Sequence, residues 1–153
     1  MDIKEILKSL KIVLPKPPKP VGSYSAYKKA GNLLYVSGQL PIKLDGSVIK
    51  GKIGKNLTLE QGQEAAYCCC LNIIAQLNSA CNEDLGLIKN CVKITGFVNS
   101  TDEFYNQAMI INPASELIKK IFGEQGVHTR AAVSVNSLPL GAAVEIDSIF
   151  EVK

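Results

Sequence analysis

The sequence predicts an α+β domain with two layers, a mixed sheet of five or six strands and two main helices on one face. Alternating apolar residues predict strands near both ends of the domain, and two longer stretches have apolar residues at helical spacing. The expected order is strand, strand, helix, strand, helix, strand, strand. Two helices cannot cover both faces of such a sheet, so we expect one face to need another cover.

Composition places the chain among ordinary globular proteins. It has 153 residues, of which 46% are hydrophobic and 20% charged, and no apolar run approaches the length of a membrane span, so we expect no membrane partner. The net charge of +3 is too small and dispersed to argue by itself for a nucleic-acid partner, and we do not expect one. Five cysteines, an odd number with three adjacent, predict free thiols in a reducing compartment, and we therefore expect a cytoplasmic protein.

Three regions are expected along the chain. Residues 1–14 have apolar side chains at helical spacing with lysines between them, which predicts an amphipathic helix and argues against a secretory signal. Residues 15–20 contain four prolines separated by lysines, which predicts an extended connector. The domain proper is expected over residues 21–153.

The elements of the domain follow from local patterns. Residues 23–28 and 33–37 are predicted to be strands around the turn at 30–32, and residues 43–56 a loop or a ragged edge strand. Thr58-x-x-Gln61 resembles a capping box and predicts a helix over 58–80. Residues 91–99 alternate as a strand, and residues 102–122 are predicted to be helical, with a fresh helix capped by Asn112 before Pro113. The last two strands are expected to form a hairpin centred near Pro139.

Arg130 and Glu145 are the main candidates for chemistry. Ala131, Val133 and Val135 have the apolar parity of their strand, and Val144, Ile146 and Phe150 that of the last strand, so we expect both polar residues to lie on the face without helices. Within a hairpin the two would be offset by about three residues, roughly 10 Å, so they would meet only across a subunit interface. A guanidinium matches the two oxygens of a carboxylate, and a glutamate can hold and deprotonate a water.

The other polar residues have plainer interpretations. Tyr24 and Ser37 can donate hydrogen bonds to a substrate or to backbone, and His128 is assigned a supporting or structural role. The adjacent cysteines 68–70 would turn by about 100° per residue on a helix and cannot converge on one metal, so they are interpreted as core residues. No glycine-rich phosphate loop follows a strand. We therefore expect neither a metal nor a cofactor.

Several blocks of the sequence together resemble the RidA/YjgF family, also labelled endoribonuclease L-PSP, over residues 20–153. The blocks are Gly22–Ser25, Gly31–Pro41, Phe97–Asn99, Thr129–Ala132, Leu138-Pro139 and Val144–Ile146. The resemblance implies a chorismate-mutase-like fold, a homotrimer with three interface sites, and hydrolytic deamination of reactive 2-imino or enamine acids to 2-keto acids. It also implies that Arg130 binds the substrate carboxylate and that Glu145 holds a water, with Tyr24, Ser37 and Asn112 as further pocket residues.

The chain departs from the family pattern at two positions beside the arginine. The family's usual proline is His128 here, and its cysteine is Ala132. Extra residues between Phe104 and Asn112 and the predicted N-terminal helix together look like a longer subgroup of the family. All these changes keep the arginine and reshape the pocket wall around it. Two alternatives stay open: a module that binds small carboxylic acids without turnover, and, with less support, an endoribonuclease.

Overall fold

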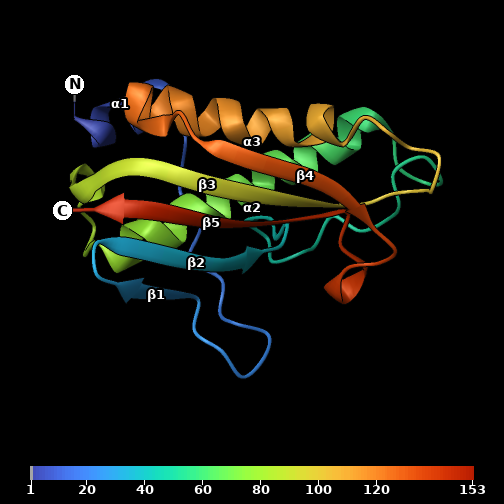
Figure 1. The fold of residues 1–153 in the computed structure, drawn as a ribbon, viewed down its shortest axis with the longest axis horizontal. Helices are drawn as coiled ribbons and strands as arrows, with labels where there is room; N and C mark the ends of the chain where they lie inside the picture. The colour runs from blue at the N-terminus through green and yellow to red at the C-terminus, as the bar shows by residue number, and fades with distance from the viewer. Residues whose placement is uncertain (1) are drawn as a thin grey trace.

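Five strands form one mixed sheet in the order β1-β2-β5-β3-β4 in the computed structural model, which describes residues 2–153 (Figure 1). The helices lie on one face of this sheet, and in Figure 1 the long helix α2 passes behind the strands. The two-layer α+β prediction is confirmed. The strands are β1 (Tyr27–Ala30), β2 (Leu33–Gln39), β3 (Ile88–Asn99), β4 (Thr129–Val135) and β5 (Val144–Val152).

The last two strands do not form the predicted hairpin. Both β4 and β5 pair with the long central strand β3, β5 antiparallel and β4 parallel. The parallel pairing arises because helix α3 (Gln107–Phe122) carries the chain back from the end of β3 to the start of β4, as a crossover connection requires. The hairpin prediction was wrong because it considered only the nearest strand in sequence.

Helix α2 (Leu59–Ala80) begins where the capping motif predicted. The Thr58 hydroxyl accepts a hydrogen bond from the Gln61 backbone N–H at 3.2 Å, and the Gln61 side-chain oxygen accepts one from the Thr58 N–H at 2.8 Å. The predicted apolar face of α2 is buried against the sheet and α3. It includes Ala65, Ala66, Cys69, Cys70, Ile73, Ile74 and Leu77.

Helix α3 continues through Pro113, contrary to the prediction of a break there. Proline has no N–H, so the carbonyl of Met109, four residues earlier, has no helical donor. The Gln63 side chain from α2 donates to that carbonyl at 2.9 Å, which supplies the missing hydrogen bond. Asn112 is therefore not an N-cap; the helix begins after Asn106.

The N-terminal region packs against the rest of the molecule. Helix α1 covers only Ile3–Ser9, which is shorter than the predicted helix, and Leu7 joins the hydrophobic core. Four of the five cysteines, Cys69, Cys70, Cys81 and Cys91, lie in the same core, while Cys68 is half-buried. No helix among residues 2–153 is long and apolar enough to cross a membrane.

The sheet presents different residues on its two faces. Val144, Ile146 and Phe150 on β5 are fully buried beneath the helices. The alternate residues of β5, among them Glu145, lie on the opposite face, which none of the described helices covers. We call this opposite surface the open face.

Candidate active site

Arg130, the only arginine in the sequence, is fixed against helix α3. Its Nη1 group donates to Asn112 Oδ1 at 2.9 Å and to Ser115 Oγ at 3.1 Å, and its Nη2 group donates to the Ala108 carbonyl at 3.3 Å. All three acceptors belong to α3, and they hold the guanidinium in the seam between β4 and this helix. The structure thus joins two sequence candidates, Arg130 and Asn112.

Arg130 does not share a face with Glu145, contrary to the prediction. Arg130 pairs in register with Ile94, whose side chain is buried under the helices, whereas Glu145 pairs with Phe97, whose side chain is on the open face. The apolar parity of β4 misled the interpretation: Val133, 46% exposed, lies on the open face. Apolar alternation in an edge strand shows that one face of the strand is apolar, but it does not show which part of the molecule that face contacts.

The predicted offset between Arg130 and Glu145 is confirmed along the strands. Ile94 pairs with both Arg130 and Ser148, so the two candidates are three positions apart in register, and β3 lies between their strands. Two strand spacings and three residues together separate their Cα atoms by roughly 14 Å. Because the two side chains also lie on opposite faces of the sheet, one chain cannot bring the Arg130 guanidinium and the Glu145 carboxyl group to the same small substrate.

The guanidinium keeps two hydrogen-bond donors after its contacts with α3 are counted. Arginine has five N–H groups, and the hydrogen bonds to residues of the described chain use both on Nη1 and one on Nη2. The N–H on Nε and one N–H on the neighbouring Nη2 remain. Two such donors can bind both oxygens of a carboxylate.

His128, the only histidine, reaches the same cluster through Ser115. Its Nε2 lies 2.9 Å from Ser115 Oγ, and its Nδ1 lies 2.6 Å from the Gly126 carbonyl oxygen. Burial is the main cause that lowers the pKa of His128; the Gly126 carbonyl acts in the opposite direction, and the positive charges of Arg130 and Lys119 lower it further. The imidazole is therefore neutral at physiological pH.

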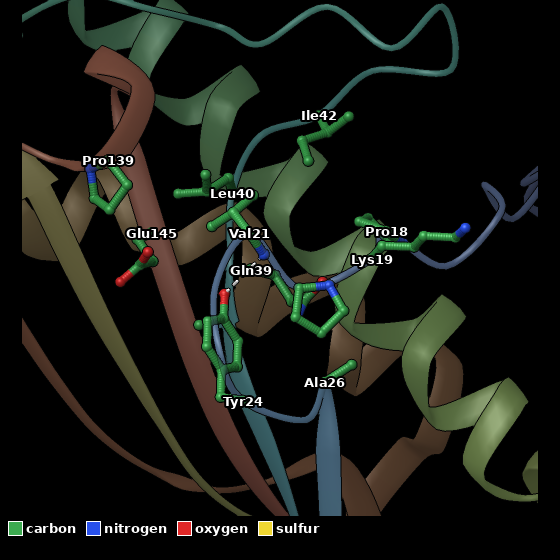
Figure 2. Close-up of a pocket in the computed structure, with 12 residues that line it drawn as sticks. Pro18, Lys19, Val21, Tyr24, Ala26, Gln39, Leu40, Ile42, Pro139 and Glu145 are labelled. Atoms are coloured by element: carbon green, nitrogen blue, oxygen red, sulfur yellow. Dashed lines mark hydrogen bonds between the residues drawn. The ribbon is translucent and has the colours of Figure 1, made fainter.

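Glu145 lines a cavity of about 320 Å³, next to the proline connector (Figure 2). Figure 2 shows Glu145 and Pro139 on one side, Pro18 and Lys19 on the other, and Tyr24 between them; the Lys19 ammonium points away from Glu145. The volume is near the lower end of the range for small-molecule sites, about 300–1,000 Å³. The other lining residues are Pro20, Val21, Ala26, Gly38, Gln39, Leu40 and Ile42.

The Glu145 carboxyl group packs directly against the backbone of Gly38. A Cβ atom placed on Gly38 would lie 2.8 Å from the Glu145 Cδ, so a larger residue here would displace the carboxyl group. Partial burial raises the pKa of Glu145, and the nearby Asp147 carboxylate raises it further. A carboxylate that is only partly hydrated is a stronger base than an exposed one, which suits a group that deprotonates water.

The two remaining candidates lie on or beside this cavity. Tyr24 is 48% exposed and its hydroxyl accepts a long hydrogen bond of 3.4 Å from the Val21 N–H, which leaves the hydroxyl hydrogen available. The Ser37 hydroxyl donates to the Ser25 carbonyl at 2.6 Å. This hydrogen bond attaches the loop that precedes β1 to strand β2, at the residue before Gly38. Tyr24 and Glu145 therefore line one cavity, with Ser37 next to its wall at Gly38, and Arg130 with Asn112 forms a separate group.

The proline connector is a wall of the cavity, a role that the sequence interpretation missed. The Gln76 side chain, only 2% exposed, donates to the Pro18 carbonyl at 2.7 Å and reaches Gln39 Oε1 at 3.3 Å. A buried glutamine on an otherwise apolar helix face was the available signal, because a buried amide needs partners. Ser115 was also missed, although it is three residues from Asn112 on a helix and so shares its face.

Within residues 2–153 we find no group of three or more His, Cys, Asp or Glu side chains arranged to hold a metal ion. Burial raises the pKa of Cys91 to about 12, and that of the half-buried Cys68 to about 11, so both thiols stay protonated near neutral pH.

Comparisons with known proteins agree with this architecture. One relative, "Protein TCP17" of Trypanosoma cruzi, is 43% identical over 95% of this chain and 91% of its own length. Another, from Dermatophagoides farinae, is 26% identical over 90% of this chain and 92% of its own length, and it is named 2-iminobutanoate/2-iminopropanoate deaminase.

Two solved structures match nearly the whole chain. Atu1372 of Agrobacterium tumefaciens, described as a protein with unknown function, has a TM-score of 0.90 and 43% identity, covering 99% of this chain and 94% of that one. A "putative endoribonuclease" from Shewanella oneidensis has a TM-score of 0.94 and 29% identity, covering 99% and 100%. Since both matches cover 99% of the chain, the N-terminal helix and connector are shared features.

The family model described as "YjgF/chorismate mutase-like, putative endoribonuclease" matches residues 6–151. The match begins inside α1, so the likeness reaches further toward the N-terminus than the motifs from residue 20 onward indicated. Fold, motifs and relatives agree, and the chain belongs to the YjgF/chorismate-mutase-like family.

Proposed function

We propose that this protein hydrolyses reactive 2-imino and enamine acids, of the 2-iminopropanoate and 2-aminoacrylate type, to 2-keto acids and ammonia. The observation that carries the proposal is the guanidinium of Arg130, held by three contacts on α3 with the Nε–H and one Nη2 N–H left for a carboxylate. The name of the relative from Dermatophagoides farinae, 2-iminobutanoate/2-iminopropanoate deaminase, supports the same chemistry.

Arg130 orients the substrate and Glu145 activates water. With the carboxylate on Arg130, the planar imine carbon faces a water that donates a hydrogen bond to the Glu145 carboxylate. The substrate reacts as the protonated imine: the water oxygen bonds to the imine carbon, one water proton passes to Glu145, and the C=N electron pair moves to nitrogen, which gives a neutral carbinolamine. Glu145 returns that proton to the amino nitrogen. The C–N bond then breaks as the hydroxyl oxygen forms the C=O bond and passes its proton back to Glu145, and ammonia leaves the 2-keto acid. An enamine first takes a proton at its β-carbon to become the protonated imine.

The steps require little acceleration beyond orientation. Imines of this kind react with water without a catalyst, so holding the imine carbon and water together accounts for a large part of the rate. Tyr24 and Ser37, at the Glu145 cavity, are assigned to substrate binding by hydrogen bonding, and Asn112 acts by holding Arg130. The mechanism uses no covalent intermediate.

The two groups meet between protomers of a homotrimer. Arg130 and Glu145 lie on opposite faces of one chain, so the Arg130 seam of one protomer must approach the Glu145 cavity of its neighbour. Apolar residues on the open face support association, since Tyr35 and Val133 are each almost half exposed. The same face includes Leu33, Phe97, Ala131, Val135 and Ile149.

A coupled assay tests this function. An L-amino-acid oxidase generates 2-iminopropanoate or 2-iminobutanoate, and the imine signal is followed with and without the protein. We expect faster loss of the imine with the wild type and no effect beyond background with Arg130→Ala. Equal activity of that variant would reject the assigned clamp.

The same preparation distinguishes the alternatives. A carboxylate that binds at Arg130 without any acceleration of imine loss would identify a binding module. Cleavage of single-stranded RNA by nuclease-free protein, with no effect on imines, would support the endoribonuclease label. We expect neither result.

A further inference from the structure

His128 belongs to a chain of hydrogen bonds that ends on the substrate-binding group. The chain runs from the Gly126 carbonyl to His128, from His128 to Ser115, and from Ser115 to Arg130, with distances of 2.6, 2.9 and 3.1 Å. The mechanism above uses Ser115 only as one of the three acceptors that hold Arg130, and it assigns no role to His128. The motif comparison also marks His128 as a departure, because the family's usual residue there is proline.

The direction of each hydrogen bond follows from the groups involved. The Gly126 carbonyl only accepts, so Nδ1 of His128 must be protonated and donate to it. In the neutral ring Nε2 is then an acceptor, and the Ser115 hydroxyl donates its hydrogen to it. The Ser115 oxygen consequently directs a lone pair toward Arg130 Nη1.

This arrangement restricts the guanidinium. Ser115 and Asn112 occupy both Nη1 hydrogens and the Ala108 carbonyl occupies one on Nη2, which leaves the Nε–H and one Nη2 N–H for a ligand. A freely rotating serine would direct its hydroxyl hydrogen toward the guanidinium part of the time. The fixed imidazole prevents this by taking that hydrogen.

We propose that His128 is a positioning residue for Arg130, acting through the Ser115 hydroxyl, and that it couples acid binding at Arg130 to proton uptake by the imidazole. The proposal deepens the proposed function, because the acid that binds is the substrate or product of that same site. It assigns roles to His128, which departs from the family pattern, and to Ser115, which lies outside the quoted motifs.

The sign of the coupling follows from the charges that face the ring. Arg130 on β4 and Lys119 on α3 are the charged groups near His128, and both oppose its protonation. A carboxylate on Arg130 offsets one of these positive charges, so the bound anion favours the imidazolium. Because linkage is reciprocal, small carboxylic acids must bind more tightly as the pH falls through the pKa of His128.

The Ser115 contact survives in both charge states. When Nε2 carries a proton it donates to the Ser115 oxygen, which can still accept from Arg130 with its second lone pair. The serine hydrogen then turns elsewhere. Protonation therefore changes the strength of acid binding without releasing the guanidinium.

Magnetic resonance can test this directly, because the chain contains one histidine and one arginine. In ¹⁵N-labelled wild-type protein at neutral pH, we expect the two ring nitrogens to show the Nδ1–H tautomer. The Arg130 Nε–H signal should shift when pyruvate, a stable 2-keto acid, is added. The Nε2–H tautomer, or rapid exchange between the two, would overturn the relay.

Pyruvate affinity as a function of pH tests the coupling. We expect the dissociation constant to fall on the order of fivefold between the neutral and protonated forms of His128. The histidine titration midpoint should move upward when pyruvate is bound. An affinity that does not depend on pH over this range, with pyruvate still bound at Arg130, overturns the coupling and leaves the proposed function intact.

Variants separate positioning from a merely structural role. Ser115→Ala should weaken pyruvate binding about tenfold, since one hydrogen bond to a charged group is lost. His128→Gln keeps an acceptor near Ser115, so it should keep the affinity and lose the pH dependence, whereas His128→Leu should lose both. The control is Ser137→Ala, an exposed serine between β4 and β5, which should behave as wild type.

The pattern of results keeps the two proposals distinct. Pyruvate binding with the expected tautomer and pH dependence, but without imine hydrolysis, contradicts the proposed function alone. Equal pyruvate affinities in wild type, Ser115→Ala and His128→Leu contradict the relay alone. A protein that binds no pyruvate at any pH contradicts both.

Discussion

The Nη1 group of Arg130 lies 2.9 Å from Asn112 Oδ1, across the seam between β4 and α3. This contact joins a strand residue and a helix residue that are 18 positions apart in the sequence. It exists because α3 continues through Pro113, which puts Asn112 in the middle of the helix and not at its start.

Substituting Asn112 should weaken acid binding without unfolding the protein. Asn112→Ala removes one of three acceptors that hold Arg130, and we expect the pyruvate dissociation constant to rise about tenfold. Isothermal calorimetry measures this. The matched control is Asn106→Ala, since Asn106 precedes the same helix and makes no side-chain cap hydrogen bond. If both variants bind alike, Asn112 does not hold the guanidinium.

The close approach of α3 to the sheet depends on Gly96. A Cβ atom on Gly96 would lie 2.5 Å from two carbons of Ile111, so Gly96→Ala forces α3 away from β3. We expect a loss of about 1–3 kcal/mol in the free energy of unfolding, measured by urea denaturation, together with weaker pyruvate binding. In the double variant with Ile111→Ala the two losses should be less than additive, because the clash is gone. Strict additivity would contradict the packing argument.

Glu145 should set the acidic limb of the pH–rate profile. Burial and Asp147 raise the pKa of this carboxyl group, so the base is lost as the pH falls through a value above the ordinary glutamate value of about 4.3. We expect kcat/KM for imine hydrolysis to fall across that limb. Glu145→Gln should reduce kcat at least about 100-fold and abolish the limb. A limb that persists in this variant belongs to another group.

The connector should influence which side chains the substrate carries. Val21 lines the Glu145 cavity and is 61% exposed, so Val21→Asp adds a charge to an apolar wall with little effect on folding. We expect kcat/KM for the leucine-derived imine to fall about tenfold relative to the alanine-derived imine. Val13→Asp is the control, because Val13 is exposed and does not line the cavity. An unchanged ratio in Val21→Asp would exclude this wall from substrate contact.

Local signals predicted the presence of the helices and the order of elements along the chain, but not the length of α1, the continuity of α3 or the way in which the candidate residues are grouped in space. The Thr58 and Gln61 pair is a complete local motif, and α2 begins where it indicates. The face of β4 was predicted wrongly, because the apolar side chain of Val133 lies on the open face, where it is 46% exposed, and not under the helices. The break at Pro113 was wrong because Gln63, distant in sequence, bonds to the carbonyl that the proline leaves free.

The arrangement of strands also required tertiary information. A hairpin between β4 and β5 is the nearest pairing in sequence, yet β3 is long enough to pair with both. The predicted register offset of three residues between Arg130 and Glu145 was nevertheless correct, because both strands pair with β3 near Ile94. No sequence motif indicated that the connector forms a wall of the cavity. The one available signal was Gln76, a polar residue on an apolar helix face, whose side chain donates to the Pro18 carbonyl.

Mixing two inactive variants tests most directly whether Arg130 of one protomer works with Glu145 of its neighbour. Arg130→Ala and Glu145→Gln are each purified, then unfolded and refolded together in equal amounts, and imine hydrolysis is measured against each variant refolded alone. Random assembly gives about one quarter of the interfaces an intact Arg130 from one chain and an intact Glu145 from the next, so about a quarter of wild-type activity should return. Mixed oligomers that form but show no more activity than the separate variants would contradict a shared site.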